Sequence, residues 1–496
     1  MRRTLVLLAA LSFIALLLPS APRASTPLPE VENICCILVY GASIDDLNGR
    51  WGTYVIDFDE SARMYLLGVS QTTDVERLSK DMRRDPAVEL IEPDRRLETP
   101  EGVRQMVLAA VGGEWEDFAA QDFTGRVGLD LAHEMSRGAG VVIAVLDTGI
   151  DPDHPAFAGR LVPGYDSIDK DDDPREETNG VDDDRDGAID EGYGHGTMVA
   201  GLIALVAPDA RIMPVRVLND EGRGTIFSVA RGMMRAMSHG AQVINMSFGA
   251  PQVMEIIEKK LRVADTHRAI TIAGAGNRGL EYPPYHPACD LYAHMVLATD
   301  SLDVKADFSD YHSTALISAP GVAVRSAYPG NEWAIGSGCS FATPIVSGTV
   351  ALMLELAPEM SAPQFEQRVA AGAVAIDALP GNEPYAGKLG AGRIDIGAAV
   401  WSYASDVAGT APAVVLPRVW PNPSSGPVQF RLGERASASR LVILDASGRV
   451  VRELGGRESL RWDGRDAFGR DVAPGIYWAR IMTGSHTDRL ELAVIR

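Results

Sequence analysis

VVIAVLDTGID, residues 141–151, decides the fold of the central part of the chain. Its first six residues are all apolar, and three later runs have the same character: RIMPVRVL (211–218), QVINMSF (242–248) and AITIAGA (269–275). A strand with one solvated face alternates apolar and polar residues, so these nearly continuous runs are expected to be buried on both faces. Strands of that kind are typical of a parallel sheet covered by helices. We therefore expect a doubly wound, mostly parallel α/β domain.

This stretch and two further motifs contain residues suited to chemistry at such a sheet. Asp147 ends the first predicted strand, where open α/β sheets place their sites. In GHGTMVAG, His195 stands between two glycines before a helix of small residues, where an imidazole is available as a general base. In GSGCSFATP, Ser340 begins an apolar helix with Pro344 in its predicted first turn, so the hydroxyl lies at the positive end of the helix dipole. The alternatives are a turn-capping aspartate, an incidental loop histidine and a helix-capping serine.

Together, LDTGID, GHGTMVAG and SGCSFATP resemble the motifs of the subtilisin family of serine proteases, in the order Asp, His, Ser. The resemblance implies a subtilisin-like fold, with Asp147, His195 and Ser340 as the catalytic triad. It also implies that Ser340 attacks the peptide carbonyl, that His195 takes its proton and that Asp147 orients the histidine. Two neighbours depart from the family pattern, since Cys339 replaces the usual threonine and Phe341 the usual methionine. These changes affect packing around the nucleophile but leave the reacting groups in place.

Two segments between the motifs extend the resemblance. NMSFG (245–249) resembles the family's substrate-pairing strand, and AGAGN (273–277) resembles the opposite wall of the specificity pocket. By this resemblance Asn277 donates to the oxyanion, whereas its alternative role is in a turn. The glycines suggest an open pocket. The predicted substrate-binding residues are Ser247, Phe248, Gly249, Gly274, Ala275 and Gly276.

An acidic segment between Asp147 and His195 suggests a structural Ca²⁺ site. Asp182, Asp184 and Asp186 alternate before a turn glycine, and Asp190 follows, as in the first half of an EF-hand-like loop. Tyr193 stands where such a loop has its bidentate glutamate. The alternative is a solvated acidic surface.

The N-terminal part is expected to contain a signal peptide and a small α+β domain. Residues 1–24 have a basic start, an apolar core and small residues near the end, although an uncleaved membrane anchor is the alternative. We expect no later membrane-spanning stretch. Residues 32–105 contain predicted strands at ILVYG (37–41), MYLLGVS (64–70) and 88–91, with a helix whose Leu78 and Met82 face a core. This region resembles the inhibitory propeptide of subtilisin-like enzymes, and an attached accessory domain is the alternative.

The catalytic domain is expected at 112–405, followed by a proline-rich linker and a β-sandwich at 412–496. The tail resembles bacterial C-terminal sandwich domains, including type IX secretion sorting tails. It suggests contact with secretion or cell-surface machinery, or a purely stabilising role.

Composition narrows the class of partner. The 496 residues contain 46 Lys plus Arg and 67 Asp plus Glu, a formal charge of −21, which excludes nucleic acid as the main partner. Of the four cysteines, adjacent Cys35 and Cys36 can hardly pair, whereas Cys289 and Cys339 form either a bridge or two thiols.

The predicted function is that of a secreted, monomeric serine endopeptidase made as a zymogen and acting on polypeptides. A catalytically silent adhesion protein would have lost Asp147, His195, Ser340 or Asn277. An esterase would show a G-x-S-x-G elbow, which is absent around Ser340.

Overall fold

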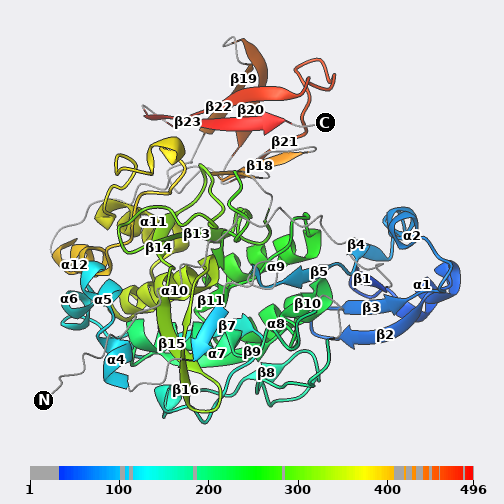
Figure 1. Cartoon of the computed structure of the whole chain (residues 1–496). Coiled ribbons are helices and arrows are strands. Elements are labelled where there is room, and N and C mark those ends of the chain that lie inside the picture. Colours follow the sequence, from blue (N-terminus) through cyan, green and yellow to red (C-terminus); the bar gives the residue numbers. More distant parts are fainter. Residues whose placement is uncertain are drawn as a thin grey trace, which may run out of the picture.

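The computed structural model describes most of the chain. The described residues are 33–100, 107–110, 115–182, 187–281, 285–406, 418–420, 427–431, 439–445, 449–456, 459–483 and 486–494. The predicted signal peptide, Asp184, Asp186 and most of the proline-rich linker lie outside them. Figure 1 shows an N-terminal sheet, a central domain with a large sheet, and C-terminal sheets in succession along the chain.

A seven-stranded parallel sheet forms the central domain (Figure 1), as the unbroken apolar runs predicted. Its strand order is β14-β13-β12-β11-β7-β9-β8. The strands are β7 (Val142–Asp147), β8 (Tyr165–Asp166), β9 (Arg211–Arg216), β11 (Val243–Met246), β12 (Ile270–Gly274), β13 (Ala293–Thr299) and β14 (Ile317–Pro320).

The strand order places the predicted site at the middle of this sheet. From β7 the chain builds β8 and β9 on one side, and then crosses to β11 on the other side. The carboxyl ends of β7 and β11 therefore flank a topological switch point, where open α/β sheets bind ligands. Asp147 ends β7, and Ser247 directly follows β11.

Two pairs of helices pack against the sheet: α7 with α10, and α8 with α9. Their bounds are α7 (His195–Val206), α8 (Ile226–Ser238), α9 (Glu255–Thr266) and α10 (Cys339–Leu356). Thr225 caps α8 through a capping box, and Gly240 follows its end with a φ of 82°. Smaller helices complete the domain: α4 (Trp115–Ala119), α5 (Asp122–Arg126), α6 (Leu129–His133), α11 (Ala362–Gly372) and α12 (Ile396–Asp406).

Helix α10 corrects two expectations. Pro344 lies inside this helix rather than in its first turn, because the helix begins at Cys339. The helix is also long and apolar enough to cross a membrane, although no stretch after the signal peptide was expected to be. Because 89% of that span is buried inside the protein, α10 is the core helix of the central domain.

The N-terminal part is a four-stranded antiparallel sheet, of order β2-β3-β1-β4, with two helices. The predicted bounds of the strand ILVYG (37–41) are wrong, since β1 lies earlier in the same apolar run. A turn follows β1, in which Ala42 N donates to the Val39 carbonyl. The elements are β1 (Asn33–Leu38), α1 (Ile44–Trp51), β2 (Tyr54–Asp59), β3 (Met64–Gly68), α2 (Val75–Met82) and β4 (Val88–Pro93). Met82 is buried as predicted, and Leu78 packs against the same core.

Two smaller sheets join the N-terminal segment to the central domain. Strand β5 (Arg96–Glu98) pairs with β10 (Arg223–Thr225) in one, and β6 (Val107–Ala110) pairs with β16 (Glu332–Gly336) beside β15 (Val324–Tyr328) in the other.

The C-terminal part contains two antiparallel sheets that share one hydrophobic cluster, with Trp462 at 1% exposure. Their strands are β17 (Arg418–Trp420), β18 (Val428–Arg431) and β21 (Ser459–Trp462), and β19 (Ser439–Asp445), β20 (Val450–Gly456), β22 (Gly475–Thr483) and β23 (His486–Val494). LVILDASGRVVREL (441–454) predicts a hairpin around Ser447-Gly448, and these two residues lie outside the described ones, between β19 and β20.

Candidate active site

Asp147 and His195 meet at the carboxyl end of β7. His195 Nδ1 lies 2.6 Å from Asp147 Oδ1, and the residues are 5% and 0% exposed. The Thr148 backbone N–H also donates to Asp147 Oδ1, at 2.8 Å. Since the carboxylate accepts the proton of Nδ1, the other ring nitrogen, Nε2, has the lone pair that a general base needs.

Ser340 lies in the first turn of α10 and is fully buried. Its Oγ donates to the carbonyl of Ser247 at 2.9 Å, and the Ser247 hydroxyl donates back to the Ser340 carbonyl at 2.9 Å. Pro344 explains the second bond, because proline has no N–H to donate to the carbonyl four residues before it. Ser247 thus satisfies a carbonyl that the helix leaves unused.

A polar chain continues from Ser247 into the core. Asn245 Nδ2 donates to Ser247 Oγ at 3.1 Å, and Ser347 Oγ donates to Asn245 Oδ1 at 2.8 Å. All three side chains are buried. Because buried polar groups are costly without partners, this chain fixes the end of β11 against α10 and therefore fixes Ser340.

Asn277 has a fixed amide orientation. Its Oδ1 accepts the backbone N–H of Cys339 at 2.9 Å, and the residue is 2% exposed. Only the oxygen of an amide accepts from an N–H, so this bond determines where the amide nitrogen points. Cys339 itself donates from Sγ to the Gly276 carbonyl at 3.2 Å, and no disulfide joins it to Cys289 among the described residues.

The two predicted pocket segments continue from neighbouring parallel strands, since Met246 pairs with Ala273. Phe248 and Ala275 are buried, and Ala275 N donates to the Val296 carbonyl. A side chain at Gly274 would come within 3.1 Å of Thr343.

Gly249 and Gly276 make room for a tyrosine. A Cβ at Gly249 would lie 2.6 Å from the Tyr285 ring, and a Cβ at Gly276, where φ is 103°, would lie 3.2 Å from it. Tyr285 is 5% exposed. The glycines were expected to open the pocket, but the space beside them is filled by this ring.

Glu176 joins the two motifs around Asp147 and His195, and the sequence did not single it out. Its carboxylate accepts from Thr148 Oγ1 at 2.5 Å, from Thr197 Oγ1 at 2.6 Å and from the Gly196 backbone at 3.0 Å. Burial raises the pKa of Glu176, against the lowering effect of the threonine hydroxyls. Its sequence signal is weak, because it is one acid within a long acidic segment.

The acidic segment is described at both ends of the predicted Ca²⁺ loop. Asp182 Oδ2 accepts the Gly187 N–H at 3.0 Å, and Asp190 accepts the N–H groups of Asn179 and Gly180 at 3.1 and 3.0 Å. Burial, together with the neighbouring Asp190, raises the pKa of Asp220. Adjacent carboxyl groups that repel one another fit a bound cation with oxygen ligands.

Residues 96–99 lie along the predicted substrate strand. Glu98 and Gly249 exchange two backbone hydrogen bonds of 3.0 Å, and Thr99 N donates to the Gly222 carbonyl at 2.9 Å. Tyr285 Oη donates to the Glu98 carbonyl at 3.3 Å. An extended segment of the chain therefore occupies the position where a peptide would add to this edge.

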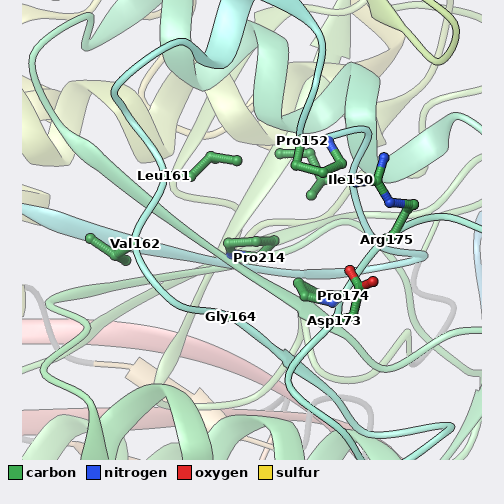
Figure 2. Close-up of a pocket in the computed structure, with 9 residues that line it drawn as sticks. All are labelled: Ile150, Pro152, Leu161, Val162, Gly164, Asp173, Pro174, Arg175 and Pro214. Carbon is green, nitrogen blue, oxygen red and sulfur yellow. The ribbon is translucent and has the colours of Figure 1, made fainter.

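A separate small pocket lies beside the segment that leads to Glu176 (Figure 2). Its volume is about 140 Å³, and it contains none of the predicted site residues. This volume is below the roughly 300–1,000 Å³ of ordinary ligand sites. It is lined by Ile150, Pro152, Leu161, Val162, Gly164, Asp173, Pro174, Arg175 and Pro214.

Comparison with known proteins agrees with this geometry. A family model described as "Subtilase family" matches residues 138–391, about half of the chain. The chain belongs to the subtilase family. It is 36% identical over 232 residues to thermitase from Thermoactinomyces vulgaris, covering 45% of this chain and 77% of thermitase. It is 37% identical over 250 residues to subtilisin BL from Lederbergia lenta, covering 48% and 84%.

This subtilase is a serine endopeptidase with the family's parallel seven-stranded fold. Fervidolysin from Fervidobacterium pennivorans has a similar fold, with a TM-score of 0.63 at 20% identity. That likeness covers 91% of this chain and 70% of fervidolysin, so it extends beyond the residues that the family model matches.

Proposed function

We propose that this subtilase cleaves polypeptides through Ser340, His195 and Asp147, with Asn277 in the oxyanion hole. The observation that carries the proposal is the 2.6 Å contact between His195 Nδ1 and Asp147 Oδ1 at the switch point of the sheet. That contact leaves His195 Nε2 to act as the base and keeps the imidazolium paired once it forms.

The reaction follows from the groups present. The Ser340 hydroxyl turns from the Ser247 carbonyl toward Nε2, gives up its proton and attacks the scissile carbonyl. The developing oxyanion is stabilised by the Asn277 amide and the Ser340 backbone N–H, at the N-terminus of α10. His195 then protonates the leaving amine, and water hydrolyses the acyl-enzyme by the reverse steps.

Replacement of the nucleophile tests this assignment. Ser340→Ala is expected to abolish turnover of casein-like substrates while the circular dichroism spectrum stays that of the wild type. Substantial activity in the purified variant would exclude Ser340 as the nucleophile. If the wild-type protein hydrolysed acyl esters but cleaved no peptide, that result would instead favour an esterase.

Residues 32–105 are proposed to be an inhibitory propeptide. The pairing of Glu98 with Gly249 supports this role, because it fills the edge where substrate would bind. A mature N-terminus between about residues 98 and 125 is expected, and N-terminal sequencing beside Ser340→Ala tests whether the enzyme makes the cut itself. Equal trimming of both proteins would exclude self-processing.

Ca²⁺ is proposed to bind the acidic loop through Asp182, Asp184, Asp186 and Asp190. The carboxylates of Asp182 and Asp190, which lie at the two described ends of this loop, support the proposal. When bound, the ion would neutralise the carboxylates and order the loop, and it takes no part in the chemistry.

Export is proposed from residues 1–24, with a catalytic domain at 112–405 and a sandwich at 412–496 that contacts secretion or cell-surface machinery. The shared core of the two C-terminal sheets supports a separate folded unit. Deletion of 412–496 is expected to change where the enzyme is found but to preserve peptide cleavage, whereas loss of cleavage would indicate a stabilising role.

A further inference from the structure

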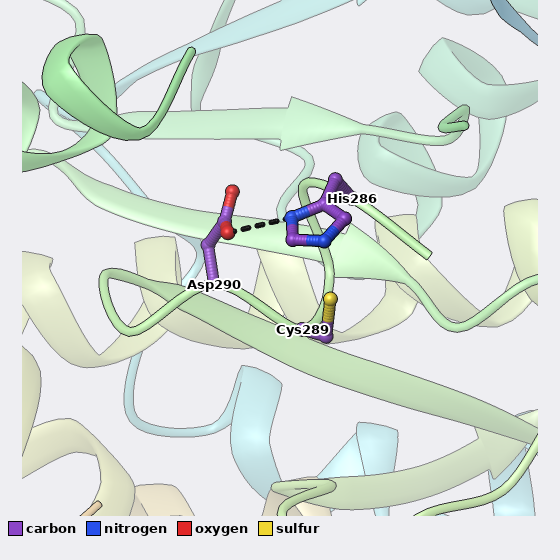
Figure 3. Close-up of side chains that lie close together, drawn as sticks. All are labelled: His286, Cys289 and Asp290. Carbon is purple, nitrogen blue, oxygen red and sulfur yellow. Dashed lines mark hydrogen bonds and ion pairs between the residues drawn. The ribbon is translucent and has the colours of Figure 1, made fainter. Parts of the chain in front are cut away.

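Three metal-ligating side chains converge in the loop between β12 and β13, away from the predicted Ca²⁺ loop. His286, Cys289 and Asp290 each offer one ligand atom, and these atoms all lie within 4.8 Å of one another. Figure 3 shows the carboxylate of Asp290 and the thiol of Cys289 beside the His286 imidazole. His286 Nδ1 lies 2.8 Å from Asp290 Oδ1.

Two of the three side chains in this cluster are buried, which distinguishes it from a chance group of exposed acidic residues. His286 and Asp290 are 0% and 3% exposed, whereas Cys289 is only partly buried. The second carboxylate oxygen, Asp290 Oδ2, is inaccessible and accepts no hydrogen bond from any described residue. A buried carboxylate oxygen without a donor is costly, so a cation beside it would be stabilising.

We propose that His286, Cys289 and Asp290 bind Zn²⁺. Thiolate, imidazole and carboxylate are the ligands that zinc takes, whereas Ca²⁺ and Mg²⁺ prefer oxygen alone. A tetrahedral zinc ion with bonds of about 2.0–2.2 Å would replace the proton now shared by His286 Nδ1 and Asp290 Oδ1 and would hold these atoms roughly 3.4 Å apart, about half an ångström more than now. Because Cys289 is only partly buried, the ion can reach the cluster from its side, and a water would serve as the fourth ligand.

The ion would stabilise a segment that contacts the predicted substrate strand. His286 and Ala250 exchange two backbone hydrogen bonds of 2.8 Å, and Ala250 follows Gly249. A ligand that binds only the folded protein raises its stability, so zinc raises the Tm. The effect on substrate binding rests on the proposed function, but the metal site itself does not.

The test uses the full-length Ser340→Ala protein, stripped with a chelator and returned to calcium. Titration calorimetry with Zn²⁺ is expected to show one tight site per chain, and Co²⁺ is expected to give a thiolate-to-cobalt charge-transfer band. Cys289→Ser should abolish the band, and both Cys289→Ser and Asp290→Asn should weaken Zn²⁺ binding at least tenfold. Cys339→Ser and Asp182→Asn are the matched controls and should bind as the parent does.

Absence of the charge-transfer band in the parent protein would overturn the proposal, whether or not the variants fold. Unchanged Zn²⁺ affinity in folded Cys289→Ser would also overturn it, as would loss of binding in Asp182→Asn. Because binding is measured in a protein without the nucleophile, these outcomes are independent of whether Ser340 is catalytic.

Discussion

Glu176 Oε2 accepts a hydrogen bond of 2.6 Å from the hydroxyl of Thr197, two residues after His195. Its other oxygen accepts from Thr148, the residue after Asp147. One buried carboxylate therefore clamps the two segments that hold the Asp147–His195 pair. We interpret Glu176 as a positioning residue, because its contacts are to the neighbours of the two proposed catalytic residues.

Glu176→Gln is expected to lower kcat by about 10- to 100-fold with little change in KM. An amide cannot accept all three hydrogen bonds in the same way, and bonds to a charged group contribute about 1.5–3 kcal/mol each. Steady-state kinetics and Tm are measured together. The control is Glu177→Gln, at an exposed neighbour, which should retain wild-type kcat. A lower Tm with unchanged kcat would make Glu176 merely structural.

Asn277→Ala is expected to lower kcat about 10²- to 10³-fold, because the oxyanion loses one donor, while KM changes little. The variant also leaves the Cys339 N–H without its present acceptor, so Tm must be compared. Asn277→Asp separates the two effects, since a carboxylate still accepts from Cys339 but donates nothing to an oxyanion. Full activity in Asn277→Asp would remove Asn277 from the oxyanion hole.

The sequence could predict the places of Asp147 and Ser340 in the fold, because both residues sit at the ends of elements with strong local signals. Asp147 ends an unbroken apolar run, and Ser340 lies in the first turn of an apolar helix. The parallel sheet then places the carboxyl ends of β7 and β11 side by side, and Ser340 contacts Ser247 just after β11. Glu176 was missed because any acid in the segment from 169 to 191 has the same local chemistry, and only the folded loop buries this one.

The wrong bounds predicted for the first strand have a similar physical cause. The run ICCILVY (34–40) is apolar throughout, so nothing in it marks where β1 ends, and tertiary pairing with β3 and β4 selects residues 33–38. Tyr40, placed in the predicted strand, is 89% exposed. The role of Tyr285 could not be predicted either. Its position beside Gly249 and Gly276 depends on how a loop folds that is distant from Gly249 in sequence.

Tyr285→Ala is expected to shift specificity toward bulky side chains at the cleavage position. The ring now fills the space between Gly249 and Gly276, and its removal leaves room for an aromatic group. The ratio of kcat/KM for phenylalanine over alanine in tetrapeptide anilides should rise more than about tenfold. Tyr311→Ala, which removes a ring packed against Tyr385, should leave the ratio unchanged. An unchanged ratio in Tyr285→Ala would place the pocket elsewhere.

Calcium is expected to raise the free energy of unfolding of the Ser340→Ala protein by RT ln(1 + [L]/Kd), and its Tm is therefore expected to rise with the calcium concentration. Tyr193 stands where an EF-hand loop has its bidentate glutamate, so we expect weak calcium binding, in the millimolar range. Replacement of Asp184 and Asp186 by Asn should flatten the calcium dependence, whereas Asp209→Asn, at an exposed acid outside the loop, should not. If calorimetry shows the same Tm in chelator and in millimolar calcium, the loop is only a solvated acidic surface.

The contact between the N-terminal domain and helices α8 and α9 is expected to weaken as pH rises. Glu92 accepts the backbone N–H groups of Glu255 and Ile256 at the start of α9, and Asp94 accepts that of Phe227 at the start of α8. Burial raises the pKa of each carboxyl to about 7, although the helix N–H groups oppose the shift. The Arg95 charge also lowers the pKa of Glu92, and the Glu255 charge raises it.

The sign follows from proton binding. On release the two carboxyls return to ordinary values of 4.5 and 3.8, so the docked state binds more protons than the released state. Docking is therefore fully favoured below pH 4 and loses this contribution as pH rises through about 7. Precursor held at pH 8 should yield active enzyme more than about tenfold faster than precursor held at pH 5, when aliquots are assayed in one common buffer.

A double variant tests the two carboxyls directly. Glu92→Gln with Asp94→Asn stays neutral at every pH, so its activation should be slow at pH 8 and nearly independent of pH. Glu89→Gln is the control, because burial does not dominate there and pairing with Lys259 lowers the pKa of Glu89. Its profile should keep the wild-type rise between pH 5 and 8. A double variant that still activates faster at high pH would mean that other groups, such as the triad histidine during self-cleavage, set the pH dependence.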